Sequence, residues 1–478
     1  MRRSGILMHI SSLPNDYGIG KLGKEAYAFV DFLEKAHQKC WQILPISPTS
    51  YGDSPYQSFS VHAGNPYFID LEALEKEGYL KPAEYKDIEW GDDKGSVDYG
   101  KIYEVIFKVL RTAHKRFRKK PEKAYSKFVV ENKDWIYDYA LFMSLKFANK
   151  GKAWYEWDEP LKMYKPKAIK SARKEYANDI DFWCFVQYKY FQQWKKLKAY
   201  ANEKGIEIIG DIPIYVAYDS VEVWSTPQYF SLDKEKKPVE VAGCPPDAFT
   251  ADGQLWGNPL YNWEYIARDK FRWWVERIKA ASNTYDVVRI DHFRGFESYY
   301  CIPYGAKNAK KGKWRKGPDM RLFKEVRKQL GDVKIIAEDL GFPGMKVLEF
   351  GFDSDNTNGY LPHNFKTTNS ICYTGTHDNE TILGWIKSCD EKTRSYCKDY
   401  LGVTKDEFVP WAMVRLCWSS VCDTAIAQMQ DILCLDDKAR MNTPSTVGAN
   451  WKWRLESFDK LDDTLAERLA KITAVYGR

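Results

Sequence analysis

The sequence lacks two features that would each mark a whole class of proteins. Its 478 residues include ten cysteines, but no two of them stand in Cys-x-x-Cys spacing, so zinc-binding and thioredoxin-like chemistry are not indicated. No run approaches the ~18 consecutive apolar residues that a membrane span needs. The segment from Met1 to Ile10 superficially mimics a signal peptide, but its apolar run is short and contains His9. We therefore expect a cytoplasmic protein with reduced thiols, no bound metal and no membrane partner.

A surplus of one charge is also missing. The chain has 72 basic and 66 acidic residues and a net charge of +6, a balance that does not suit a nucleic-acid partner. The densest basic run, residues 115–120, predicts a solvated helix face, with an acidic partner as the alternative. We find no low-complexity linker and no obvious repeat. The oligomeric state stays open.

Aromatic residues, in contrast, are abundant. They make up 15% of the chain, with 18 Trp and 32 Tyr. Most of them belong in a core, but Trp and Tyr also suit sugar binding, because an apolar sugar face stacks on a ring whose polar edge can still hydrogen-bond. The composition is therefore a hint of a carbohydrate ligand.

Three apolar runs lead into acidic residues. Val287–Ile290 precedes Asp291, residues 335–337 precede Glu338, and a less regular run precedes Asp378. Apolar runs of this kind predict parallel strands that are buried on both faces. An acid at the carboxyl end of such a strand lies where α/β barrels place their chemistry, and glycoside chemistry needs at least two carboxylates.

Strand-like runs alternate with helical stretches along the chain, which indicates a parallel α/β architecture. Eight strands in βα alternation predict a (β/α)₈ TIM barrel. We expect helices at about 24–37 and 271–278. The predicted strands are 5–10, 40–46, 206–214, one beginning at 287, 333–337, 347–352, one beginning near 370, and 425–433.

Large insertions interrupt this alternation. Residues 1–478 are expected to form one catalytic barrel domain, with a helical insertion at 70–200 after strand two and a loop insertion at 215–265 after strand three. Trp183, Val186, Tyr190, Trp194 and Leu197 fall at helical spacing, and a glycine at 205 ends that helix. Residues 243–261 and 436–453 combine Gly and Pro with Trp and Asn, which predicts two ligand-binding loops.

Each candidate acid has a structural alternative. Arg289 and Asp291 lie on the same face of a strand, so the guanidinium would keep Asp291 ionised, or the two form a purely structural ion pair. Glu338 follows an apolar run, which would raise its pKa as a general acid requires, or it is an ordinary strand-end carboxylate. His377, Asp378 and Asn379 could bind sugar hydroxyls or a metal, and Asp211 could simply end a strand. Four strands that each deliver an acid to one end of the sheet favour the functional interpretation.

The chain resembles the 4-α-glucanotransferases of glycoside hydrolase family 77, the amylomaltase or disproportionating-enzyme family related to the α-amylases. The resemblance extends nearly from end to end. The motifs that carry it are Ser54-Pro55-Tyr56-Gln57, residues 210–216, residues 253–261, residues 289–295, residues 337–341, Leu361-Pro362-His363-Asn364, residues 376–379 and Arg440-Met441-Asn442-Thr443-Pro444. Alanine at 248 and cysteine at 434 depart from the family's pattern, and Ala248 removes a ring that relatives could use to guide glucan chains.

The resemblance implies a role for each matching residue. Asp291 is similar to the family's nucleophile, Glu338 to its general acid/base and Asp378 to its transition-state stabiliser. The remaining matches imply substrate contacts, namely Tyr56, Asp211, Gln254, Trp256, Arg289, His292, His377 and Asn442. The family also lacks the C-terminal β-domain of the amylases, and we expect none here.

The implied reaction is retaining transfer of α-1,4-glucan segments between maltooligosaccharides or starch-like glucans, without a cofactor because carboxylates do the chemistry. One alternative is an α-1,4-glucan hydrolase with the same acids that admits water. Another is a catalytically decayed glucan-binding protein. The two predicted loops are expected to approach each other over the cleft, with Trp256 and Asn442 on the acceptor side, and to exclude water.

Overall fold

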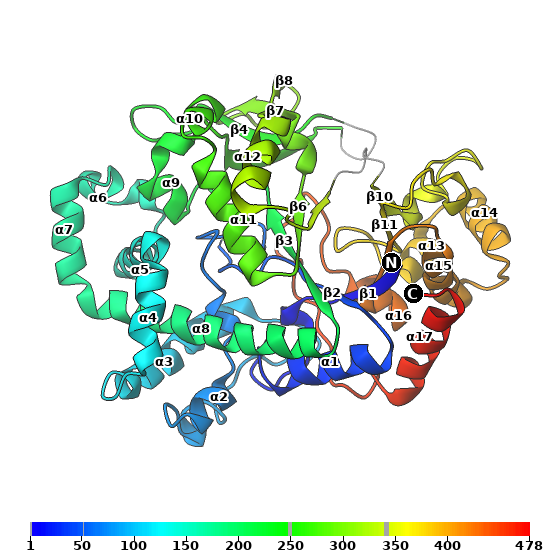
Figure 1. Ribbon diagram of the computed structural model, residues 1–478, viewed down its shortest axis with the longest axis horizontal. Helices are drawn as coiled ribbons and strands as arrows, with labels where there is room; N and C mark the ends of the chain where they lie inside the picture. The colour runs from blue at the N-terminus through cyan, green and yellow to red at the C-terminus, as the bar shows by residue number, and fades with distance from the viewer. Residues whose placement is uncertain (1, 51, 247–250, 339–343) are drawn as a thin grey trace.

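The barrel sheet consists of parallel strands arranged around the centre of the molecule (Figure 1). The computed structural model describes residues 2–50, 52–246, 251–338 and 344–478. Within these ranges eight strands form one sheet in the order β10-β11-β12-β1-β2-β3-β6-β9. They are β1 (Arg3–Leu7), β2 (Cys40–Gln42), β3 (Glu207–Pro213), β6 (Val287–Asp291), β9 (Ile335–Ala337), β10 (Met345–Val347), β11 (Ile371–Tyr373) and β12 (Thr424–Gln428). The predicted α/β barrel is confirmed, and every ladder pair between neighbouring strands is parallel.

Helices follow most of the barrel strands. In α1, the buried residues Ala26, Phe29, Val30 and Leu33 recur at the spacing of one helix face, which packs on the sheet. Outside the insertion after β2, the described helices are α1 (Lys24–Lys35), α9 (Val221–Ser225), α10 (Trp263–Arg268), α11 (Arg272–Thr284), α12 (Met320–Leu330), α13 (Ile382–Ser388), α14 (Glu391–Leu401), α15 (Val409–Ser419), α16 (Met429–Ile432) and α17 (Asp463–Val475). No helix in the described part of the chain is long and apolar enough to cross a membrane.

The chain between β2 and β3 is mostly helical. It contains α2 (Leu71–Lys76), α3 (Tyr99–Phe117), α4 (Lys123–Glu131), α5 (Lys133–Ala148), α6 (Glu159–Lys162), α7 (Pro166–Glu175) and α8 (Ala177–Glu203). Trp183, Tyr190 and Trp194 are buried along α8 as their spacing predicts, and Gly205 takes a positive φ of 71° just beyond the helix end. Figure 1 shows α3 to α7 on the opposite side of the molecule from α13, α14 and α17, while α8 leads back to α1.

A second sheet joins two excursions from the barrel. It is antiparallel and runs in the order β5-β4-β7-β8, with β4 (Glu240–Cys244), β5 (Gln254–Pro259), β7 (Ser298–Pro303) and β8 (Lys313–Lys316). The first two strands follow β3 and the last two follow β6. The prediction of a continuous loop at 243–261 is therefore wrong, because its first residues complete β4 and residues 254–259 form β5.

Several predicted barrel strands have different bounds, and two of them continue directly into a helical turn. The strand expected at 347–352 is β10 at Met345–Val347, and a 3-10 turn at Leu348–Gly351 follows it. The strand expected at 425–433 is β12, which ends at Gln428 before the short helix α16. In both places the apolar run continues from the strand into a helical turn that is itself buried, so hydrophobicity alone did not mark the boundary.

The strands β9 and β10 are the two ends of the described ladder, and residues 339–343 between them lie outside the described ranges. The prediction that residues 335–337 are buried on both faces is wrong, since all three are half-buried, whereas all five residues of β12 are buried.

Candidate active site

The predicted acids meet at one edge of the barrel. Asp211 lies in β3 and its backbone pairs with Arg289 of β6. Asp291 is the last residue of β6, and Glu338 directly follows β9. Asp378 lies five residues beyond the end of β11. Because the strands are parallel, their carboxyl ends open onto the same face, where a barrel binds its ligand.

Arg289 is the central cation of this cluster. It is 2% exposed, and its guanidinium forms an ion pair with Asp211. It also lies 3.4 Å from Asp291 Oδ1 and 3.8 Å from Glu338 Oε1. One buried guanidinium therefore faces three carboxylates on three neighbouring strands. Within the described residues, no group of three or more His, Cys, Asp or Glu side chains is arranged to hold a metal ion.

Burial outweighs this cation in setting the charge of two acids. Burial raises the pKa of Asp291 to about 7, while Arg289 lowers it and the negative charges of Asp211 and Asp378 raise it further. Burial likewise raises the pKa of Asp211 to about 6, against Arg289 and a hydrogen bond from Tyr56. Arg289 was predicted to keep Asp291 ionised; it does lower the pKa of Asp291, but burial raises that pKa by more. The Asp291 side chain is 30% exposed, so it keeps access to a ligand.

Glu338 is held mainly by the backbone of the residues that surround the end of β6. The His292 amide donates to Glu338 Oε2 at 2.8 Å, and the Phe293 amide donates to the Glu338 carbonyl at 2.7 Å. The Glu338 amide in turn donates to the Ile290 carbonyl at 3.1 Å. The carboxyl group, whose side chain is 15% exposed, thus contacts polar partners as well as the apolar run that precedes it.

Asp378 lies on a tight turn that hydrogen bonds from Arg440 and Asn442 hold in place. Asn442 Nδ2 donates to Asp378 Oδ1 at 2.6 Å, and Arg440 Nη2 donates to the Asp378 carbonyl at 2.8 Å. The Asn442 amide donates to the His377 carbonyl at 3.1 Å. The Asp378 side chain is 44% exposed, the most open of the three predicted catalytic acids. Arg440 was part of a recognised motif, but its contact with the Asp378 backbone was not predicted.

A ring stack connects Asp378 to Asp211. Tyr56 lies on His377 with ring centroids 5.1 Å apart and planes 13° apart, and its hydroxyl donates to Asp211 Oδ2 at 2.8 Å. Burial raises the pKa of Tyr56 well above its ordinary value and lowers that of His377 to about 4, so both side chains are neutral near pH 7. The Trp451 ring lies beside both, with its centroid 5.8 Å from that of Tyr56 and 5.9 Å from that of His377. It lies near the end of a loop that was predicted to bind the ligand, but its contacts with Tyr56 and His377 were not predicted.

The remaining predicted residues, Gln254 and Trp256, belong to β5 and lie beside His292. Trp256 packs its ring edge against His292 with centroids 4.9 Å apart, and its indole N–H donates to Gln254 Oε1 at 3.0 Å. Gln254 and Trp256 alternate on β5 and so share one face of that strand. Each of the eleven predicted site residues therefore contacts at least one other. The structure brings together side chains that the sequence spreads from position 56 to 442.

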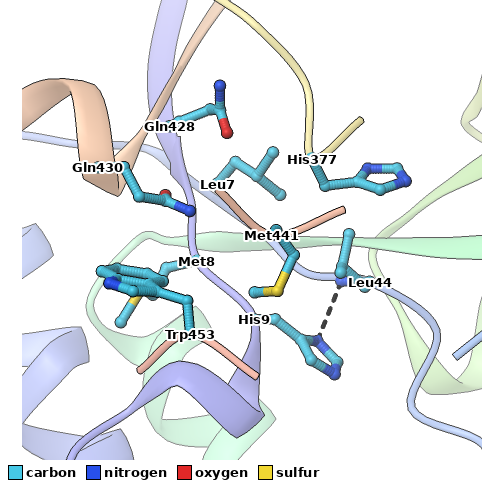
Figure 2. Close-up of a pocket in the computed structure, with 9 residues that line it drawn as sticks. All are labelled: Leu7, Met8, His9, Leu44, His377, Gln428, Gln430, Met441 and Trp453. Carbon is cyan, nitrogen blue, oxygen red and sulfur yellow. Dashed lines mark hydrogen bonds between the residues drawn. The ribbon is translucent and has the colours of Figure 1, made fainter. Parts of the chain in front are cut away.

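A small pocket lies below His377 in the barrel interior. Figure 2 shows its lining by Leu7, Met8, His9, Leu44, His377, Gln428, Gln430, Met441 and Trp453. His9 Nδ1 accepts a hydrogen bond from the Leu44 amide at 3.2 Å, and burial lowers the pKa of His9 to about 3. His9 is thus a neutral structural support, and β1 and β12 supply part of the floor of the site. Of the residues singled out in the sequence, Ala248 and residues 339–341 lie outside the described ranges.

Carboxylates at the strand ends of a barrel, with aromatic rings beside them, are typical of enzymes that cleave glycosidic bonds with a pair of carboxylates. The family model described as 4-alpha-glucanotransferase, glycoside hydrolase family 77, matches residues 8–460. A 4-alpha-glucanotransferase of Clostridium butyricum is 48% identical across 98% of this chain and 100% of its own length. The amylomaltase of Streptococcus agalactiae, solved in complex with acarbose, superposes with a TM-score of 0.97 at 43% identity, and each chain is covered completely. The chain belongs to glycoside hydrolase family 77, the 4-alpha-glucanotransferases.

Proposed function

We propose that this enzyme transfers segments of α-1,4-glucan by a retaining double displacement in which Asp291 is the nucleophile and Glu338 the acid/base. Asp291 attacks the anomeric carbon while Glu338 gives its proton to the leaving oxygen, and a glycosyl ester on Asp291 forms. The 4-hydroxyl of an acceptor sugar then attacks this ester and returns its proton to Glu338. The observation that carries the proposal is the location of both acids on adjacent strands of a family 77 barrel.

The charge distribution supports these roles. A nucleophile must be ionised, and Arg289 at 3.4 Å lowers the pKa of Asp291 against the effect of burial. Asp378 is proposed to bind sugar hydroxyls and to strengthen these bonds as positive charge develops on the ring. Its exposure and its fixation by Asn442 suit that role. Tyr56, Asp211, Gln254, Trp256, Arg289, His292, His377 and Asn442 are proposed to contact substrate.

The proposed donors and acceptors are maltooligosaccharides and longer α-1,4-glucans. The relative that was solved with acarbose supports this substrate class. A cytoplasmic location is proposed as well, because all ten cysteines lie in the described ranges and are thiols, as a reducing compartment favours.

Incubation with maltotriose tests the function. Transfer should produce glucose together with maltopentaose and longer oligosaccharides, while the number of reducing ends stays nearly constant, because each bond broken is replaced by a new one. A steady rise in reducing ends without longer products would instead identify a hydrolase. An inert wild-type protein would support the decayed binding protein. Asp291→Asn is the matched negative control.

Trp256 of β5 and Asn442 of the segment 436–453 are proposed to select sugar over water as acceptor. Trp256 contacts His292, whose backbone holds Glu338, so it stands beside the acid/base. Trp256→Ala should raise the ratio of hydrolysis to transfer about tenfold, or ~1.4 kcal/mol of discrimination between acceptors. Reducing ends gained are measured against glucosyl units moved. Equal loss of both activities would show that Trp256 only supports the fold.

A further inference from the structure

Behind the turn that carries His377 and Asp378 lies a buried acid that the proposed reaction does not use. Glu349 belongs to the 3-10 turn after β10 and is 8% exposed. Its Oε1 accepts a hydrogen bond from Asn379 Nδ2 at 3.3 Å. Its Oε2 is buried, and no residue in the described part of the chain hydrogen-bonds to it. A carboxyl group in this position needs a physical explanation, because burial of an incompletely bonded charge is costly.

The partner of Glu349 organises the turn. Asn379 Oδ1 accepts from the Thr376 amide at 2.8 Å and from the Thr376 hydroxyl at 2.9 Å. Thr376 Oγ1 accepts from the Asp378 amide at 3.4 Å. Asn379 can satisfy these bonds only with its oxygen toward Thr376 and its NH₂ group toward Glu349. A chain of hydrogen bonds thus leads from Glu349 to the backbone of Asp378.

The space between these groups is tightly filled. A side-chain carbon on Gly375 would lie 2.7 Å from Gln428 Nε2, 3.2 Å from Asn379 Cβ and 3.5 Å from Glu349 Oε2. Glu349 therefore packs directly against the backbone at the start of the turn. Displacement of its carboxyl group would leave a cavity beneath the turn, with Asn379 unsupported on one side.

The surroundings favour an uncharged Glu349. Burial raises its pKa well above the ordinary value, and the nearby acids Glu380 and Asp431 raise it further. The hydrogen bond from Asn379 and the charge of Arg440 oppose this but do not compensate for it. A glutamine at this position would have nearly the same shape as Glu349 and would keep one acceptor oxygen for Asn379.

We propose that Glu349 is a positioning residue that orients Asn379 and thereby the turn on which Asp378 meets the substrate. The proposal deepens the proposed function and rests on the role of Asp378 in it. Glu349 itself touches no substrate. Its effect must therefore depend on Asp378, which separates positioning from simple structural support.

A double-mutant cycle tests this dependence. Glu349→Ala should lower kcat for maltotriose transfer about tenfold with little change in KM, but less than about twofold when Asp378 is already Asn. Glu349→Gln should keep kcat within about threefold of wild type, because it preserves the shape and the oxygen that accepts from Asn379. Glu222→Ala is the matched control. Glu222 is also buried with one unbonded oxygen, but it binds Ser60 and Val61, so its effect should be equal in both backgrounds.

If Glu349→Ala does not fold, an exchange of the carboxyl and amide groups between positions 349 and 379 tests the proposal. Asn379→Asp places a second carboxyl against Glu349 and should lower kcat, and the addition of Glu349→Gln should restore part of it by returning an amide donor. Equal losses in both backgrounds of the cycle, a Gln variant as poor as Ala, or no restoration by the exchange overturns the proposal. A wild-type enzyme without transfer activity would overturn the proposed function itself, and an unimpaired Asp378→Asn would overturn the role of Asp378.

Discussion

The strands that carry Asp291 and Glu338 are neighbours in the barrel, yet they are held very differently. β6 has five residues, pairs with β3 and β9, and buries Val288 and Ile290 at 1% and 0% exposure. β9 has three half-buried residues and, in the described ladder, pairs with β6 alone. The position of Asp291 follows from its own strand. The position of Glu338 depends instead on hydrogen bonds that it accepts from the backbone amides of His292 and Phe293, just beyond β6.

The comparison teaches that a catalytic pair can depend on one strong strand. The two apolar runs look alike in sequence, and each leads directly into an acid. Because β6 ends in the proposed nucleophile and the residues just beyond it hold the proposed acid/base, the distance between the two carboxyls is set locally. The following predictions test this asymmetry, from the largest expected effect to the smallest.

Asp291→Asn should remove transfer activity by several orders of magnitude and leave the fold intact. An amide cannot form the ester intermediate, and its size preserves the packing at the end of β6. Product formation from maltotriose measures the loss, and circular dichroism checks the fold. A glycosyl-enzyme trapped on any other residue would contradict the assignment and remove the basis of the comparison.

Glu338→Gln should lower turnover of natural glucans by roughly 10²–10⁴-fold, the usual contribution of a general acid. Glutamine can keep the hydrogen bond from the His292 amide, so the loss reports proton transfer and not a displaced side chain. A donor with a very acidic leaving group needs little protonation and should lose far less. If both donors suffer equally, Glu338 is not the acid.

The two strands should also differ in their contribution to stability. Ile290→Ala in β6 deletes a fully buried side chain and should lower the free energy of unfolding by about 2–5 kcal/mol. Ile336→Ala in β9 removes the same atoms from a half-buried position and should cost about 1 kcal/mol. Urea unfolding of both variants measures the difference. Equal losses would show that β9 is as well supported as β6.

The smallest effect concerns pH. Burial raises the pKa of Asp291 to about 7, and its ionised form is the nucleophile, so kcat/KM should fall as pH drops through about 7. The charge of Asp211 raises this pKa. Asp211→Asn should therefore shift the acidic limb to lower pH, by up to about one unit, whatever its effect on the maximum rate. A limb that stays in place would mean that the two carboxyls do not interact.

Much of the fold could be predicted because local patterns were strong. The apolar run at 287–290 and the spacing of Trp183, Tyr190 and Trp194 required a buried strand and a buried helix face. The pairing of β4 with β7 could not be predicted, because it joins two excursions that are distant in sequence. The exposure of β9 was missed since an apolar run does not reveal whether neighbours cover both of its faces.

The site was predictable to the extent that motifs carry it. All eleven predicted residues lie in one contact network, although their chemical roles remain predictions. Glu349 was missed because its contribution is visible only as a contact with Asn379. Trp451 and Asn379 lay in predicted ligand-binding segments, but their contacts with His377 and Thr376 could not be predicted. The spacing of a sequence shows which acids reach the strand ends. It does not show which neutral side chains hold them there.

The pairing of β1 has a consequence for synthesis. Arg3 of β1 pairs with Thr424 of β12, so the partner of this edge of β1 is synthesised only when nearly the whole chain is complete. At roughly 5–20 residues per second, a ribosome takes about 20 to 80 s to produce that partner. The other edge of β1 pairs with β2, which begins at Cys40, so this partner is synthesised early, as is helix α1. The nascent chain therefore carries an open β edge for most of its translation, and this interval is when a chaperone has the most to protect.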